Sequence, residues 1–116
     1  MKLLHPDPEQ IELSLVLAAL SDPTRLSIVR QLAEDGETEA MCGTFGMYGS
    51  KSNLSYHFAK LREAGVTRTR VEGTARYITL RRDDLDARFP GLLDSVVKAA
   101  AAYPRIDLQA EAVAGA

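Results

Sequence analysis

Apolar residues along the first half of the chain recur at helical spacing. From Glu9 to Leu20 they cover much of the helical circumference, which predicts a helix with a partner beyond its own core. The motif Ser21-Asp22-Pro23-Thr24 predicts the start of a second helix. Asp22 can accept hydrogen bonds from free amide groups there, and Pro23 suits the first helical position. Gly36 closes this helix.

The next two segments differ in their expected stability. Residues 37–50 contain apolar residues at loose helical spacing and three glycines, each of which costs about 1 kcal/mol relative to alanine in a helix. We therefore expect a short helix or a single turn there. In the helix that follows, Leu54, Phe58 and Leu61 recur at i, i+4 and i+7, and Gly65 suits its C-terminus.

Beyond Gly65 the apolar period changes from 3.6 to 2. Residues 66–71 and 75–80 are rich in β-branched and aromatic residues, and they predict a hairpin closed by a three-residue turn, Glu72-Gly73-Thr74. Asp83 and Asp84 are then expected to cap a helical turn that Pro90 interrupts. A last helix with an apolar stripe is expected from Leu92 until the chain reaches Tyr103-Pro104.

The helix around Leu54 carries an unusual polar face. The apolar stripe leaves five hydroxyl-bearing or basic side chains pointing outward, namely Lys51, Ser52, Ser55, Tyr56 and Lys60. No acidic residue occurs between positions 40 and 62. Small hydrogen-bonding groups flanked by cations suit a helix in the major groove of DNA, where they meet base edges while the cations hold phosphates. The alternative is an ordinary solvated, serine-rich helix.

Charge is segregated along the chain. Residues 51–82 hold eight basic and two acidic side chains, a net charge of +6, whereas the remainder holds six basic and fourteen acidic side chains. The overall net charge of −2 therefore hides a basic module on an acidic body. Segregation of this kind steers a polyanion to one face of a protein. Arg68 and Arg70 are expected on one face of the hairpin, with Arg76 just past its tip.

Length and cysteine content predict a single domain from a reducing cytoplasm. We expect a flexible leader at residues 1–8, one domain over residues 9–103 and a frayed tail at residues 104–116. Cys42 is the only cysteine, so no intrachain disulfide or thiolate cluster can form. The first residues lack the apolar region of a signal peptide, and no apolar run approaches the ~18–20 residues that cross a bilayer.

The order of expected elements resembles a winged helix-turn-helix. Residues 19–29, ALSDPTRLSIV, are similar to the second-helix signature of the ArsR-type (ArsR/SmtB) transcriptional repressors. Residues 50–58, SKSNLSYHF, with residues 61–66, LREAGV, resemble that family's recognition helix and its exit into the wing. The resemblance covers about residues 10–103, and it implies a mainly α fold with a β-hairpin wing.

The same resemblance implies partners and residue roles. The family forms homodimers through the first and last helices, occupies a promoter operator and leaves it when an effector binds. The residues implied to face DNA are Lys51, Ser52, Asn53, Ser55, Tyr56, His57, Lys60, Arg68, Arg70 and Arg76. The residues expected at the dimer interface are Leu13, Leu17, Leu93, Val96, Val97 and Ala100.

The sequence departs from the family at its metal sites. Metal-sensing members place two cysteines one residue apart before the third helix, but residues 39–43 contain only one thiol. A second family site uses Asp and His residues on the last helix, and no histidine follows His57. We therefore expect no metal site and no other cofactor. His5 with Asp7 and Glu9 is a candidate metal site between subunits, or simply part of a solvated tail.

Three functional interpretations remain from the sequence. The first is a sequence-specific DNA-binding regulator, a homodimeric repressor released by an effector. The second is a winged-helix protein-interaction module without DNA binding, which would have no reason to carry the basic segment. The third is a redox regulator acting through Cys42, whose thiol would need a lowered pKa; the alternative for Cys42 is a small buried apolar residue. An enzyme is not expected, because no phosphate loop, Ser/His/Asp set or paired carboxylates in an apolar setting are present.

Overall fold

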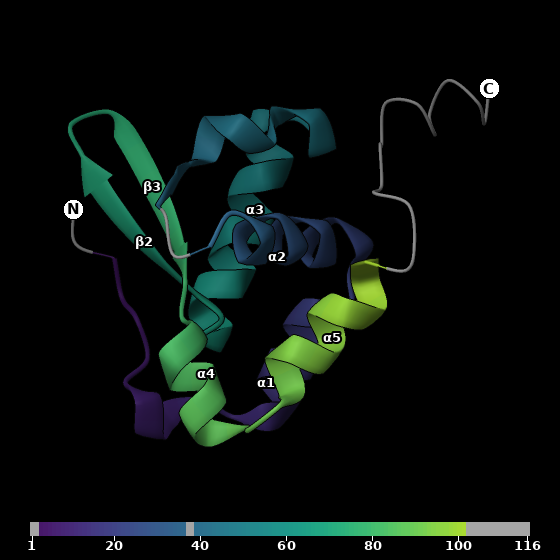
Figure 1. Ribbon diagram of the computed structural model, residues 1–116. Coiled ribbons are helices and arrows are strands. Elements are labelled where there is room, and N and C mark those ends of the chain that lie inside the picture. The colour runs from purple at the N-terminus through teal and green to yellow at the C-terminus, as the bar shows by residue number, and fades with distance from the viewer. Residues whose placement is uncertain (1–2, 37–38, 102–116) are drawn as a thin grey trace.

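The computed structural model describes residues 3–36 and 39–101. It is mainly helical with a small antiparallel sheet, as predicted, and Figure 1 shows the hairpin projecting to one side of the helices. The elements in chain order are a short 3-10 helix η1 (Pro8–Gln10), α1 (Leu13–Leu20), α2 (Pro23–Glu34), β1 (Ala40–Met41), a 3-10 helix η2 (Cys42–Tyr48), α3 (Lys51–Ala64), β2 (Thr67–Glu72), β3 (Ala75–Leu80), α4 (Arg82–Arg88) and α5 (Leu92–Ala101).

The first helix is shorter than the sequence predicts. The prediction of a helix from Glu9 is wrong, because η1 occupies that position and α1 begins only at Leu13. The η1 turn is closed locally, with the Asp7 N–H donating to Gln10 Oε1 at 2.8 Å. Ile11 then adopts an extended backbone and is buried in the core. Burial of Ile11 at this point separates the two helical segments.

Helices α2 and α3 begin and end at the residues that the sequence indicates. Asp22 Oδ1 accepts a hydrogen bond from the Arg25 N–H at 3.0 Å, and Pro23 is the first residue of α2. Ser50 Oγ accepts from the Asn53 N–H at 3.2 Å at the start of α3. Gly65 ends α3 in the left-handed conformation, at φ 85°. These capping groups satisfy amides that have no partner inside the helix.

The segment between α2 and α3 contains a strand that the sequence did not predict. In β1, Ala40 lies opposite Ile78 and Met41 opposite Tyr77, antiparallel to β3. A two-residue strand is too short to show a period of 2, which explains why it was missed. The expected short helix is the 3-10 helix η2, and it buries Phe45 and Tyr48.

The sheet has the strand order β1-β3-β2, with β2 at an edge. Glu72 pairs with Ala75, so the turn between them contains only Gly73 and Thr74. The predicted three-residue turn is therefore wrong by one residue. Gly73 has φ 61°, the left-handed value that glycine adopts readily at the first position of a type II′ turn. Across the ladder, Thr69 pairs with buried Ile78, so this pair faces the core.

The N-terminal segment lies along the free edge of β2 (Figure 1). His5 Nε2 accepts a hydrogen bond from the Thr69 N–H at 3.0 Å, and Arg81 Nη1 donates to the Pro6 carbonyl at 2.8 Å. The leader predicted at residues 1–8 thus has contacts with the sheet and with Arg81, and its flexibility stays a prediction. Covering an edge strand in this way satisfies its outward amide groups and blocks pairing with another chain. Because His5 Nε2 already has a partner, it does not act as a ligand in this arrangement.

The C-terminal helices contribute to the same core. Arg81 occupies the N-cap position of α4 without a side-chain capping hydrogen bond, and Asp83 and Asp84 lie in the first turn, so the prediction that the two aspartates cap this helix is wrong. Pro90 and Gly91 separate α4 from α5, which packs against α2. The predicted helix end at Tyr103 and the tail at 104–116 lie outside the described residues. Leu93 is only 2% exposed and belongs to the core of this chain, which corrects its assignment to the dimer interface.

Candidate nucleic-acid interface

The exposed face of α3 has the composition that the sequence predicts. Leu54, Phe58 and Leu61 are buried beneath the helix, which confirms the predicted stripe. The side chains left exposed are Lys51, Ser52, Asn53, Ser55, Tyr56 and Lys60. Lys60 Nζ lies 5.5 Å from the centre of the Tyr56 ring, so a cation and a hydroxyl-bearing ring lie together midway along this face. Between Lys51 and Lys60 the face offers hydroxyl, amide and ammonium groups and no carboxylate, and exposed Glu63 follows in the last turn of α3.

His57 does not belong to this exposed face, contrary to the sequence prediction. Its side chain is buried, with the residue 7% exposed, and it points toward α2. Nδ1 of His57 lies 3.1 Å from Arg25 Nη1 and 3.8 Å from Asp22 Oδ1. Burial lowers the pKa of His57, with Asp22 opposing the shift and Arg25 adding to it. Its helical position places it one residue beyond the outward-facing pair Ser55 and Tyr56, on the side that meets α2.

Arg25 is a positioning residue that the sequence analysis did not single out. Its Nε donates to the Ala19 carbonyl at 2.7 Å and its Nη2 to the Ala18 carbonyl at 3.4 Å, at the end of α1. Together with its contact to His57, this guanidinium joins three helices. In the sequence Arg25 appears only as the last residue of the motif SDPTR. A basic residue three positions after a helix cap ordinarily has a solvated side chain, so its role was not predicted.

The wing arginines point from two faces of the hairpin. Residues paired directly across an antiparallel ladder share a face. Arg68 pairs with Thr79 and Arg70 with Tyr77, whereas Arg76 pairs with Val71. Arg76 therefore lies on the same side as the Thr69–Ile78 pair, toward α3. Arg68 and Arg70 point from the opposite side, as expected from their spacing.

Arg70 is paired within the chain. Its Nε and Nη2 donate to the two carboxylate oxygens of Glu39 at 2.9 Å each, and its Nη1 donates to Glu72 at 2.7 Å. The guanidinium also lies over the Tyr77 ring, 4.4 Å from the ring centre. The hydrogen bonds from Arg70 lower the pKa of Glu39, and those to Glu39 and Glu72 raise the pKa of Arg70. A DNA phosphate would have to compete with both carboxylates for this side chain.

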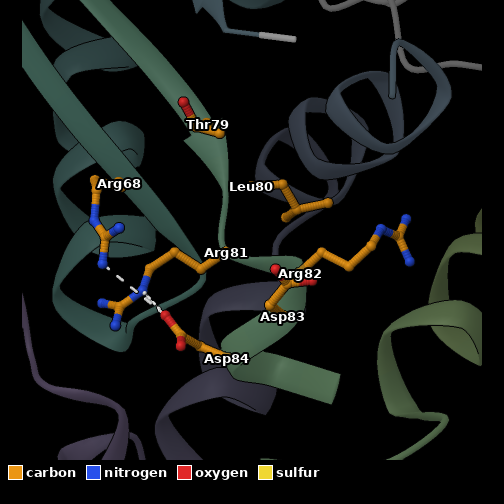
Figure 2. A pocket seen from close by; sticks show the side chains of 7 residues that line it. All are labelled: Arg68, Thr79, Leu80, Arg81, Arg82, Asp83 and Asp84. Carbon is orange, nitrogen blue, oxygen red and sulfur yellow. Dashed lines mark hydrogen bonds and ion pairs between the residues drawn. The ribbon is translucent and has the colours of Figure 1, made fainter. Parts of the chain in front are cut away.

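Asp84 and Asp94, which lie outside the basic segment 51–82, form ion pairs with arginines inside it. Figure 2 shows dashed lines from Asp84 to both Arg81 and Arg68, which line a cavity of about 410 Å³ at the base of the wing. Asp84 Oδ2 lies 2.9 Å from Arg81 Nε and 4.0 Å from Arg68 Nη2. Arg82 Nη1 donates to Asp94 at 2.8 Å. The basic side chains of segment 51–82 that are not paired with a carboxylate of the described residues therefore lie on α3 and at Arg76.

The environment of Cys42 does not favour a reactive thiolate. Burial raises the pKa of this half-buried thiol, although the nearby charge of Arg76 opposes the shift. A redox switch would need a thiol with a lowered pKa, but here the pKa of Cys42 is raised. Desolvation of the thiolate outweighs the attraction of the Arg76 guanidinium. Within residues 3–36 and 39–101, no three His, Cys, Asp or Glu side chains gather as a metal site would require.

Comparison with known proteins identifies the family. A family described as a helix-turn-helix domain matches residues 20–70, from the end of α1 into β2. The chain is 41% identical over 83 residues to the uncharacterized HTH-type transcriptional regulator YceK of Bacillus subtilis (strain 168), covering 70% of this chain and 82% of that protein. HlyU from Vibrio cholerae N16961 superposes with a TM-score of 0.59 at 25% identity, covering 74% of this chain and 88% of HlyU. The chain belongs to the ArsR-type winged helix-turn-helix regulators.

A further solved structure supports the fold of this ArsR-type regulator. An ArsR family transcriptional regulator superposes with a TM-score of 0.56 at 22% identity, covering 85% of this chain and 90% of that one. Family and fold are those of DNA-binding transcriptional regulators rather than of enzymes. Among the described residues of this ArsR-type chain, no helix is long and apolar enough to span a bilayer.

Proposed function

We propose that this ArsR-type regulator is a homodimeric repressor that reads its operator with the exposed face of α3. The observation that supports this most strongly is the exposed stretch of α3 from Lys51 to Lys60, which carries Ser52, Asn53 and Tyr56 between two cations and contains no carboxylate. Hydroxyl and amide groups of this size reach base edges in the major groove, and ammonium groups contact the flanking phosphates. The link from Arg25 to His57 supports a fixed orientation of this helix against α1 and α2.

The wing contributes mainly through Arg76 in this proposal. Arg76 is exposed and points from the α3 side of the hairpin, and its side chain makes no hydrogen bond or ion pair with the described part of the chain. It can bind a phosphate without first losing a carboxylate partner. Arg70 and Arg68 contribute less, because Glu39, Glu72 and Asp84 already lie beside them.

The proposed dimer uses α1 and the outer face of α5. Leu13 and Leu17 lie one turn apart and are each 46% exposed, while Val96, Val97 and Ala100 are half-buried on α5. Large apolar side chains exposed on consecutive turns commonly mark a protein interface. Two copies joined here would present two α3 helices to successive major grooves, about 10–11 base pairs apart on a pseudo-palindrome.

A reporter experiment tests repression directly. The promoter of the chain's own gene is fused to a reporter and measured with and without the protein, and the same duplex is titrated with the purified chain. Repression predicts higher reporter output without the protein and saturable binding at two half-sites. Lower output without the protein would make it an activator, and absence of preferential binding would remove this promoter as its operator.

A further inference from the structure

A cavity of about 490 Å³ lies between α3, the hairpin and the start of η2. Leu54 and Phe58 of α3 provide apolar walls, Thr69 of β2 lines the hairpin side, and Cys42 and Gly43 line the η2 side. This volume falls in the range of roughly 300–1,000 Å³ that small-molecule sites occupy in proteins. The cavity is large enough for a compact organic molecule.

Three cations and no carboxylate line this cavity. Lys51 and Arg62 come from α3 and Arg76 from β3. Unlike the side chains of Arg70, Arg81 and Arg82, none of these three side chains forms a hydrogen bond or ion pair with another described residue. Close, unneutralised cations repel one another, so this cavity has a positive potential that an anion would relieve.

Two buried polar atoms of the lining residues have no hydrogen-bond partner. Thr69 is 6% exposed, and neither its Oγ1 nor the Nε of Arg62 bonds to any other described residue. Leaving such a group buried without a partner costs about 1–3 kcal/mol, so most buried polar atoms are paired. Both a hydroxyl and a guanidinium N–H can donate to an anionic oxygen.

We propose that this cavity binds a small organic anion, a carboxylate or phosphate monoester with an apolar body. The anionic oxygens accept from Arg62 and Thr69 and are attracted by Lys51 and Arg76. The apolar body lies against Leu54 and Phe58. Cys42 is a neutral wall of the site and takes no covalent part in binding.

The regulatory consequence rests on the proposed DNA-binding function. Lys51 and Ser55 lie on the exposed face of α3, and Arg76 is the wing cation best placed for a phosphate, yet all three also line this cavity. An anion in the cavity neutralises two cations that would otherwise meet DNA. Binding of the anion and of DNA is therefore mutually weakening, and thermodynamic linkage makes the factor equal in both directions.

The binding proposal is tested without DNA by two-dimensional amide NMR of the full chain. Benzoate and phenyl phosphate are titrated to about 10 mM, roughly tenfold above a millimolar Kd, at constant ionic strength. Uncharged benzamide is the matched control. Saturable shifts centred on the amides of Cys42, Gly43 and Thr69 with at least one anion, and none with benzamide, are expected. No saturation with either anion, equal response to benzamide, or shifts centred elsewhere would overturn the proposal.

Two variants separate this site from general charge effects. Thr69→Val keeps the side-chain shape but removes the unpartnered hydroxyl, and it should weaken binding of the anion several-fold with a Tm equal to or above that of the wild type. Arg82→Gln removes a cation outside the cavity and should leave the anion affinity unchanged. Equal loss in both variants would contradict the assigned site.

The coupling is then measured by DNA titration with and without saturating anion. Wild-type affinity for DNA should fall, and Thr69→Val should bind DNA normally while responding less to the same anion concentration. Unchanged DNA affinity with the cavity filled would refute the coupling but leave the site intact. Failure of the chain to bind DNA at all would refute the proposed function and would not affect the NMR result.

Discussion

Arg25 Nη1 lies 3.1 Å from Nδ1 of His57, which joins α2 to the buried side of α3. A guanidinium can only donate, so His57 Nδ1 accepts and the ring proton of the neutral form resides on Nε2. The same Arg25 donates to two carbonyls at the end of α1. A side chain that joins three helices in this way fixes the angle at which the exposed face of α3 is presented.

Protonation of His57 should destabilise the fold. Burial, aided by Arg25, lowers the pKa of His57 below its ordinary value near 6.5 in the folded state, so the unfolded chain binds the proton first as pH falls. The free energy of unfolding should therefore decrease as pH drops from about 7.5 to about 5.5. Urea unfolding at the two pH values measures this. His57→Asn retains an acceptor near Nδ1 and cannot titrate, so it should show a smaller pH dependence. An equal dependence in this variant would assign the effect to other groups, including His5, whose pKa is also lowered.

Arg76 and Arg70 should differ in their contribution to DNA binding. Arg76→Ala should weaken binding to all sequences and make the logarithmic salt dependence shallower by roughly one per subunit, because one phosphate contact is lost. Arg70→Ala should have a smaller effect, because Glu39 and Glu72 already hold that side chain. Fluorescence anisotropy across a salt series measures both variants. A larger change in slope for Arg70→Ala would reverse this assignment.

Gly65→Ala should destabilise the fold more than Gly73→Ala. Both glycines have positive φ, at 85° and 61°, so alanine costs roughly 1–2 kcal/mol at either position from the backbone alone. At Gly65 a Cβ would also lie 2.6 Å from Cγ1 of buried Ile11, whereas nothing lies within 4 Å at Gly73. Denaturant unfolding of both variants should show the larger loss at Gly65. Equal losses would mean that Ile11 can move aside freely.

Leu17→Glu should shift the proposed dimer toward monomer while leaving the chain folded. Leu17 is 46% exposed on α1, so its replacement opens no cavity in the core, but it places a charge in the proposed interface. Met47→Glu is a matched control, because Met47 is 50% exposed on η2, away from α1. Sedimentation velocity measures the change. A monomeric wild type, or an unchanged dimer in Leu17→Glu, would remove α1 from the interface.

Features set by local sequence were predictable, and those set by distant partners were not. The start of α2 at Pro23 and the end of α3 at Gly65 depend on residues within one turn of the chain. The burial of His57 depends on Arg25, which is 32 residues away, and the pairing of Arg70 depends on Glu39, 31 residues away. Periodicity contains no record of such contacts.

The exposed face of α3 was predictable because its orientation follows from the apolar stripe. Leu54 and Phe58 fix which side is buried, and the polar side chains follow. The cavity beside that face was not predictable, since it forms only where Arg62 and Thr69 from different elements meet. The sequence therefore indicated the surface that we propose meets DNA, but not the site that we propose regulates it.

The most direct test of the central claim compares Asn53→Ala with wild type on two duplexes, the chain's own promoter and a random sequence, at one salt concentration. Asn53 is exposed on α3, and its side chain is not the capping group of the helix. If the α3 face reads bases, affinity for the promoter should fall by about 1–3 kcal/mol, with affinity for the random duplex nearly unchanged. An equal loss on both duplexes, or no loss on either, would contradict base recognition by this face.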